Sequence, residues 1–312
     1  MFDALQKKLR EKLVNWLIKE PAPEAIPPYD YERLRYEVRP GDVLLIEGRS
    51  RISNIIRGIT QSPWTHAALY IGRFHDIEDH SLKKMISRQL KKRENVRLVI
   101  EVMLGKGTIV TPLVHYRHTH IRICRPTRLS PEDAQLVIAY AVNSLGKPYN
   151  VRRLLDLARF LLPWSILPRR WKSSLFRTST GEIESGICSS MIADAFNSVQ
   201  FPILPLFQSE QEGITVIKRN PHLYSPKDFD YSPYFEIIKC PTLSPEEERP
   251  FYRRMPWSTT AMHHDHGIVS TPSKKIEDKK ANIFSRFSKK KSSTDSTEDE
   301  NKSHTPDHPE TD

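Results

Sequence analysis

Short apolar segments separated by turns constrain the fold of this chain most strongly. They cover residues 43–48, 66–72, 97–104, 107–116 and 121–126, and a sixth follows at 234–239. Segments this short, rich in β-branched and aromatic residues and bounded by turn residues, are typical of strands. The Gly105-Lys106-Gly107 turn joins two of them directly, as in an antiparallel hairpin. The sequence therefore predicts a largely antiparallel sheet.

Three segments with helix signals lie among these strands. Ser130 can cap a helix that begins at Pro131 and ends near Gly146. Residues 51–60 predict a shorter helix, and the apolar residues that follow Cys188 recur at helical spacing. Together the elements predict an α+β fold in which an antiparallel sheet packs on the helix that begins with Cys188.

Changes in composition along the chain predict its division into segments. The first residues combine apolar and basic positions at helical spacing, prolines follow them, and apolar residues become rare towards the C-terminus. The predicted segments are an amphipathic helix at 1–20, a proline-rich linker at 21–35, a folded domain at 36–254 with a basic and apolar insertion at 150–185, and a disordered charged tail at 255–312. This organisation predicts one domain with appendages.

The net charge of +10, from 48 Lys and Arg against 38 Asp and Glu, favours anionic partners. In residues 1–20 and 150–177 the basic residues lie beside apolar and aromatic ones, which is typical of segments that contact an anionic membrane surface. Packing of these segments on the domain explains the same pattern, so both interpretations stay open. We do not expect nucleic acid as a partner, and the sequence indicates no oligomeric state.

The chain shows no signal-peptide pattern near Met1 and no apolar run long enough to span a membrane. Its cysteines, Cys124, Cys188 and Cys240, lack the spacing of a disulfide framework or of a zinc site. We therefore expect a cytoplasmic protein that uses no metal or cofactor. Peripheral attachment to the inner membrane stays open beside a freely soluble state.

Cys188 is the strongest candidate for chemistry because it lies at the predicted start of a helix. The positive end of the helix dipole lowers the pKa of a thiol there and populates the nucleophilic thiolate. The alternative is a small buried apolar residue with no chemical role.

His66 and Glu101 are the candidates that would serve this thiol. His66 lies at the start of a predicted strand, where its ring could act as a general base. Glu101 interrupts the apolar segment 97–104, and a carboxylate inside a strand of this kind needs a partner. A histidine at a strand end and a carboxylate on an edge strand also occur without chemical roles, so these alternatives stay open.

The order of these motifs resembles that of the circularly permuted papain-like hydrolases of the NlpC-type superfamily, in particular the YiiX/YebB-like branch. The matching stretches are RPGDV at 39–43, THAALYIG at 65–72, VIE at 99–101, LGKPY at 145–149 and ICS at 187–189. The resemblance extends over roughly residues 36–240 and implies a permuted papain-like fold, in which the histidine precedes the cysteine.

The resemblance also implies roles for four residues. Cys188 would be the nucleophile, His66 its base, Glu101 the residue that orients the histidine, and Tyr149 a residue that helps to hold the oxyanion. In this chain the insertion at 150–185 separates Tyr149 from Cys188, whereas the tyrosine of the family lies close before the cysteine.

The implied activity is hydrolysis of an amide, ester or thioester through an acyl-enzyme. A membrane-associated, lipid-like substrate and a cell-wall peptide are both compatible with this activity. The alternative function is a non-catalytic module that binds a membrane surface and retains the fold.

Overall fold

The computed structural model describes ten stretches of the chain. They are residues 11–12, 14–21, 29–77, 79–90, 96–147, 188–210, 213–243, 255–258, 261–264 and 267–270. Tyr149 and the insertion predicted at 150–185 lie outside the described residues. The chain divides into two units, residues 1–244 and 245–312, and the candidate site lies in the first.

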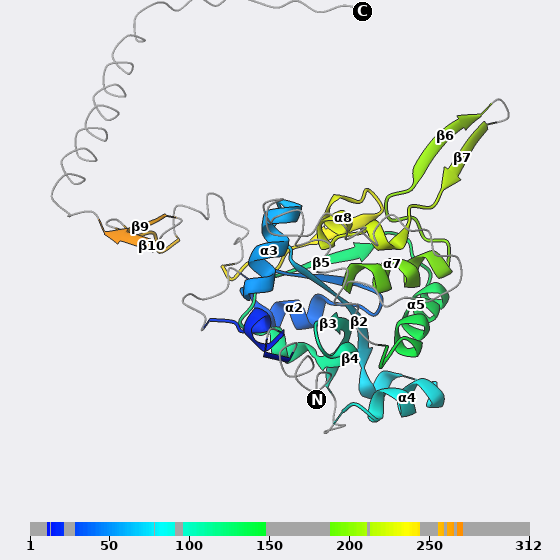
Figure 1. The fold of residues 1–312 in the computed structure, drawn as a ribbon, viewed down its shortest axis with the longest axis horizontal. Coiled ribbons are helices and arrows are strands. Elements are labelled where there is room, and N and C mark those ends of the chain that lie inside the picture. The colour runs from blue at the N-terminus through cyan, green and yellow to red at the C-terminus, as the bar shows by residue number, and fades with distance from the viewer. Residues whose placement is uncertain are drawn as a thin grey trace, which may run out of the picture. The chain divides into compact units, whose positions relative to one another are not determined.

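A six-stranded sheet forms the centre of the first unit (Figure 1), and each of its neighbouring pairs is antiparallel. In the order of the sheet the strands are β4 (Gly107–Pro112), β3 (Arg97–Met103), β2 (His66–Arg73), β1 (Val43–Ile46), β5 (Ile121–Pro126) and β8 (Phe235–Ile238). All six segments expected as strands form strands of this sheet. The predicted antiparallel sheet is confirmed.

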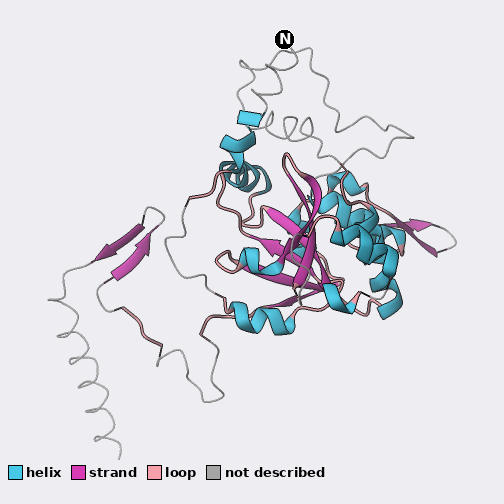
Figure 2. Cartoon of the chain, turned by 90° about the horizontal axis from the view of Figure 1, so that it is seen from below, coloured by secondary structure: helices cyan, strands magenta, loops and turns pink. Residues whose placement is uncertain are grey.

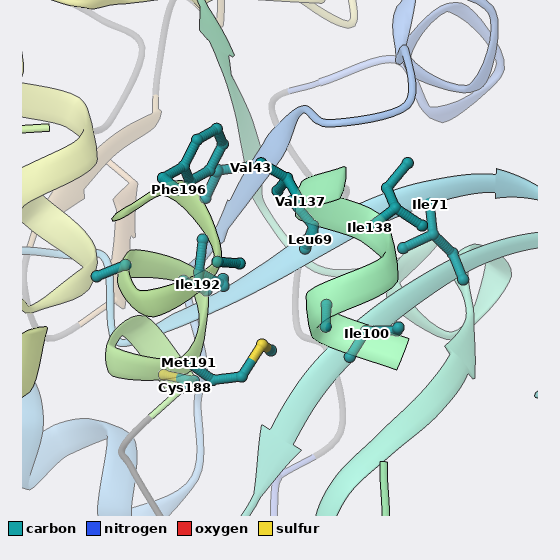
Figure 3. Packing of buried hydrophobic residues seen from close by; sticks show 14 of the residues in the cluster. Val43, Leu69, Ile71, Ile100, Val137, Ile138, Cys188, Met191, Ile192 and Phe196 are labelled. Carbon is teal, nitrogen blue, oxygen red and sulfur yellow. The ribbon is translucent and has the colours of Figure 1, made fainter. Parts of the chain in front are cut away.

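Both faces of the sheet are buried, which explains why its strands are apolar at nearly every position. On one face the sheet packs against α4 (His80–Ser87), α5 (Pro131–Asn143) and α7 (Cys188–Ser198), where Leu69, Ile100 and Ile192 belong to the main core (Figure 3). On the other face, α2 (Tyr31–Glu37) and the short 3-10 helix η2 (Leu113–Tyr116) cover a second cluster. In Figure 2 the strands of this six-stranded sheet lie between helices.

The remaining elements connect or extend this body. They are α3 (Arg51–Thr60), η1 (Phe74–Asp76), the hairpin of β6 (Leu206–Glu210) and β7 (Gly213–Ile217), η4 (Pro221–Leu223) and α8 (Pro226–Tyr231). None of the helices in the described part of the chain is long and apolar enough to cross a membrane.

The predicted linker at 21–35 differs from the structure in its second half, where α2 begins. Asp30 caps this helix, because its Oδ1 accepts hydrogen bonds from the backbone N–H groups of Glu32 (2.9 Å) and Arg33 (3.2 Å). Leu34 of α2 is 1% exposed, so the helix is part of the folded body. Because prolines precede Asp30, the segment was predicted to be a linker, and this short capped helix was not recognised in the sequence.

Asp30→Ala is expected to lower the free energy of unfolding by about 1 kcal/mol, because two backbone N–H groups lose their acceptor. Asp30→Asn should change it less, since the asparagine side chain also caps helices well. Urea unfolding followed by circular dichroism measures both variants. Equal stability of the alanine variant and the unchanged chain would contradict the role of the cap.

The second unit contains the hairpin of β9 (Ala261–His264) and β10 (Gly267–Ser270). We expected disorder over 255–312, so the structure differs from that expectation at these eight positions. Ile268 and Val269 pair with His263 and Met262. Two adjacent β-branched residues favour a strand locally, although the composition of the tail as a whole is polar.

Candidate active site

Cys188 is the first residue of α7, and its side chain is 4% exposed. The backbone N–H groups of Ala67 and Ser189 hydrogen-bond to its sulfur, so the sulfur lies at the start of β2. Burial raises the pKa of the Cys188 thiol, but the charge and hydrogen bond of His66 and the two N–H groups outweigh burial. The net result is a lowered pKa, as a nucleophilic thiolate requires.

His66 lies between Cys188 and a carboxylate. Its Nε2 is 2.6 Å from Oε2 of Glu101, which leaves Nδ1 as the ring nitrogen available to the sulfur. Burial lowers the pKa of His66, but the charge and hydrogen bond of Cys188, followed by those of Glu101, raise it to about 10. These two neighbours therefore favour the protonated form of the ring, which lies between the Cys188 sulfur and the Glu101 carboxylate. The His66 side chain remains 22% exposed.

Glu101 reaches the histidine because of the strand register. Ala68 of β2 is directly opposite Glu101 of β3. His66 is two residues from Ala68 along β2, so it lies on the same face and diagonally opposite Glu101. The Glu101 side chain is completely buried, which favours the neutral acid, yet the hydrogen bond and charge of His66 lower its pKa.

Tyr116 is a member of this site that the sequence analysis missed. Its hydroxyl donates a hydrogen bond to Oε2 of Glu101, the oxygen that also contacts His66. The hydroxyl of Tyr29 in turn donates to the backbone carbonyl of Tyr116 at 2.7 Å. The segment 107–116 was expected to be one strand, but β4 ends at Pro112 and η2 follows. That change of direction brings the ring of Tyr116 to the carboxylate.

A cleft of about 290 Å³ opens onto these groups. Cys188, His66, Glu101 and Tyr116 line it, so the buried cysteine borders a cavity. Three of the four residues singled out in the sequence therefore meet at one cleft. The fourth, Tyr149, lies outside the described residues.

A second histidine–carboxylate pair provides a comparison within the same domain. His120 Nδ1 is 2.9 Å from Oε2 of Glu47, and both side chains are about one third exposed. Arg57 also contacts Glu47, at 3.5 Å. Neither His120 nor Glu47 lines the cleft of Cys188. Within the described ranges, no group of three or more His, Cys, Asp or Glu side chains is placed to hold a metal ion.

Comparison with known proteins matches residues 37–156 to a family described as permuted papain-like amidase enzymes, YaeF/YiiX, C92 family. The matched segment includes His66 and Glu101 and ends before Cys188. A solved structure described as the metalloprotein yiiX from Escherichia coli O157:H7 is similar at 16% identity and a TM-score of 0.40, over 65% of this chain and 97% of that chain. No curated protein matches the chain.

The family match confirms the resemblance to the permuted papain-like hydrolases that the sequence motifs indicated. It also confirms the predicted fold class, a permuted papain-like α+β fold with an antiparallel sheet.

Proposed function

From the resemblance to permuted papain-like amidases, we propose that this chain is a cysteine hydrolase that transfers an acyl group to water. Cys188 is the nucleophile, His66 the general acid and base, and Glu101 the positioning residue. One observation carries the proposal: a single imidazole contacts both the Cys188 sulfur and the buried Glu101 carboxylate at one cleft. The match to an amidase family supports a hydrolase.

The proposed reaction has two halves. In the first, the Cys188 thiolate attacks the carbonyl carbon of an amide, ester or thioester and forms a carbon–sulfur bond. The backbone N–H of Cys188, with the hydroxyl of Tyr149 as a second donor, stabilises the oxyanion. The His66 imidazolium then gives its proton to the leaving group as the bond to it breaks. In the second half, His66 takes a proton from water, the hydroxide attacks the acyl carbon, and the thiolate leaves.

Glu101 keeps its negative charge throughout this cycle. By accepting from Nε2 it holds the ring with Nδ1 towards the sulfur and favours the imidazolium form. Tyr116 donates to the same carboxylate and so limits its rotation. Both residues act through His66 and do not contact the substrate carbonyl in this mechanism.

The substrate remains within the two classes that the sequence suggested, a membrane-associated, lipid-like molecule or a cell-wall peptide. Attachment to an anionic membrane surface through residues 1–20 and 150–177 is part of the proposal, and residues 150–177 lie outside the described part of the chain. The competing function is a non-catalytic surface module. The strong burial of Cys188 within the main core cluster favours that alternative, because an inert cysteine packs in the same way.

The pH dependence of thiol alkylation separates the two functions. In the His66→Gln variant, burial still raises the pKa of the Cys188 thiol, and no imidazolium is present to lower it. Alkylation of Cys188 by iodoacetamide at pH 6 to 7 is then expected to slow by about 10- to 100-fold, and to recover as the pH rises. The rate is measured by mass spectrometry of the peptide that contains Cys188.

His120→Gln is the matched control, because His120 also pairs with a carboxylate but does not line the cleft. Its alkylation profile should coincide with that of the unchanged protein. If the alkylation profile of His66→Gln also coincides with that of the unchanged protein, the thiolate does not depend on His66 and the enzyme proposal fails.

A further inference from the structure

A second pocket, with a volume of about 670 Å³, lies apart from the cleft of Cys188. The two cavities share no lining residue. The cleft of Cys188 extends to Ile18 of the N-terminal segment, and Arg51 seats this segment by a hydrogen bond to the carbonyl oxygen of Trp16 (3.1 Å). The second pocket is lined from other elements, so what it binds does not depend on the proposed hydrolase mechanism.

Three basic side chains line the second pocket together with two carboxylates. The cations are Arg122 of β5, Arg219 of the segment between β7 and η4, and Lys227 of α8 (Figure 1). The carboxylates are Asp228 and Asp230, both of α8. Only the fold brings these cations together, since β5 and α8 are far apart in the chain. The hydrogen bonds that these groups already make decide which kind of ligand fits.

Arg122 is fixed in place by two contacts. Its guanidinium lies 4.7 Å from the centre of the Trp64 ring, and its Nη1 donates to Oδ1 of Asp230 at 2.6 Å. The indole N–H of Trp64 donates to Oδ2 of the same aspartate at 3.3 Å. Because Trp64 is 2% exposed, the ring that supports the guanidinium is itself packed in the fold. A guanidinium held in this way loses little conformational entropy when it binds an anion.

Arg219 repeats this arrangement at the other side of α8. Its guanidinium lies 5.0 Å from the centre of the Tyr224 ring, its Nη1 donates to Oδ1 of Asp228 at 3.3 Å, and its Nη2 donates to the carbonyl oxygen of Leu223 at 3.1 Å. Oδ2 of Asp228 accepts from the backbone N–H (2.6 Å) and the hydroxyl (2.8 Å) of Ser225, which caps α8. Both oxygens of this aspartate are therefore engaged within the protein.

The three cations keep hydrogen-bond donors in excess of these contacts. A guanidinium carries five N–H donors and an ammonium three. In the described part of the chain, Arg122 uses one of them and Arg219 two. Lys227 uses one, for the carbonyl oxygen of Thr60 at 2.9 Å. The two carboxylates, in contrast, already accept a hydrogen bond at each oxygen. A pocket with surplus donors and engaged acceptors favours a ligand rich in acceptor oxygens.

We propose that the second pocket binds the phosphoryl group of a phosphate monoester, held by Arg122, Arg219 and Lys227. A phosphoryl group presents three terminal oxygens on a tetrahedral centre, which suits three cations that come from separate elements. A carboxylate presents only two oxygens in one plane and leaves one cation without a partner. A soluble phosphate ester and the headgroup of a phospholipid with a terminal phosphate share this chemistry.

Isothermal titration calorimetry of the full chain with inorganic phosphate, at an ionic strength held constant with chloride, provides the first test. Lys227→Gln and Arg219→Gln are each expected to weaken phosphate binding by about tenfold, the effect of losing one charge-assisted hydrogen bond. Lys227→Gln leaves both arginine–aspartate pairs in place, so its result does not depend on their contribution to folding. Arg122→Gln should weaken binding at least as much, and its circular dichroism spectrum shows whether it remains folded.

Arg35→Gln is the matched control, because the net charge of +10 attracts anions to any basic surface of this chain. Arg35 pairs with Glu32 at 2.7 Å and stacks on the ring of Tyr36 at 5.5 Å. Its side chain is 36% exposed, as is that of Arg219, but it does not line the second pocket. The control should bind phosphate as the unchanged protein does. Equal weakening in Arg35→Gln and Lys227→Gln overturns the inference, and so does a lack of phosphate binding by the unchanged protein.

Two further probes identify the source of the phosphoryl group. Glycerol 3-phosphate is titrated in solution, and phosphatidylcholine vesicles with and without phosphatidic acid are sedimented with the protein. Binding to phosphatidic acid that Lys227→Gln weakens and Arg35→Gln does not supports a phospholipid headgroup. The same dependence for glycerol 3-phosphate alone supports a soluble ester. If neither probe depends on Lys227, no phosphate monoester occupies the pocket and the inference is overturned.

Discussion

Cys188→Ala is expected to lower kcat/KM for p-nitrophenyl ester hydrolysis by about 10⁴-fold or more. Without the sulfur no acyl-enzyme can form, and only the residual effect of binding and oxyanion stabilisation remains. Cys188→Ser should fall nearly as far, because a serine hydroxyl at that position is not ionised by an imidazolium neighbour. Initial rates of nitrophenolate release at pH 7 measure both variants.

Cys240→Ala provides the control for this result. Cys240 is 5% exposed, and burial raises the pKa of its thiol, so it is an inert cysteine of similar burial that does not line the cleft. Its removal should leave kcat/KM close to that of the unchanged protein. Retention of ester hydrolysis by Cys188→Ala would place the nucleophile elsewhere and end the proposed mechanism.

Glu101→Ala is expected to lower the free energy of unfolding by about 3–5 kcal/mol, the loss typical of a buried ion pair with one partner removed. The His66 imidazolium would lose its carboxylate, and the hydroxyl of Tyr116 would lose its acceptor. Glu101→Gln should destabilise less, because its amide oxygen can still accept from Tyr116. Urea unfolding at several pH values measures the difference between the unchanged protein and each variant.

The dependence of this difference on pH follows from the direction of the two pKa shifts. The pKa of Glu101 is lowered from 4.5, so its contribution to stability is present above about pH 4.5 and is lost as the pH falls through the folded-state pKa. The pKa of His66 is raised from 6.5 to about 10, so its contribution is present below 6.5 and is lost as the pH rises through about 10. The effect of Glu101→Ala should therefore be largest near neutral pH and shrink on both sides.

Glu47→Ala tests whether burial of the ion pair causes the large loss of stability that we expect for Glu101→Ala. Glu47 makes the corresponding contact with His120, but both side chains are about one third exposed. Its loss should lower the free energy of unfolding by only about 1 kcal/mol or less. If Glu101→Ala has no larger effect than Glu47→Ala, the buried pair does not stabilise the fold in the way proposed.

The elements of the fold followed from local patterns. Apolar runs bounded by turn residues indicated each strand of the sheet, and Ser130-Pro131 indicated the start of α5, because strand periodicity and helix capping depend on neighbours only a few residues apart. The N-terminal part of α2 and the hairpin of β9 and β10 were missed, since prolines and polar composition around them outweigh short local signals.

Only part of the candidate site could be predicted from the sequence. Glu101 stood out because a carboxylate interrupts an apolar strand, and Cys188 because it begins a helix. Tyr116 and Ile18 carry no such signal, since each resembles an ordinary residue of an apolar segment. Their places at the cleft depend on the turn into η2 and on the seating of the N-terminal segment.

By itself, the amino-acid sequence indicated the six strands of the sheet, the helices α3, α5 and α7, and the polar side chains that lie within these segments. The tertiary structure alone decided that Glu101 lies diagonally opposite His66, that the sulfur of Cys188 reaches the start of β2, and that Ile18 lines the same cleft. The register of two strands and the approach of a distant helix depend on packing between residues far apart in the chain, and local periodicity contains no information about that packing.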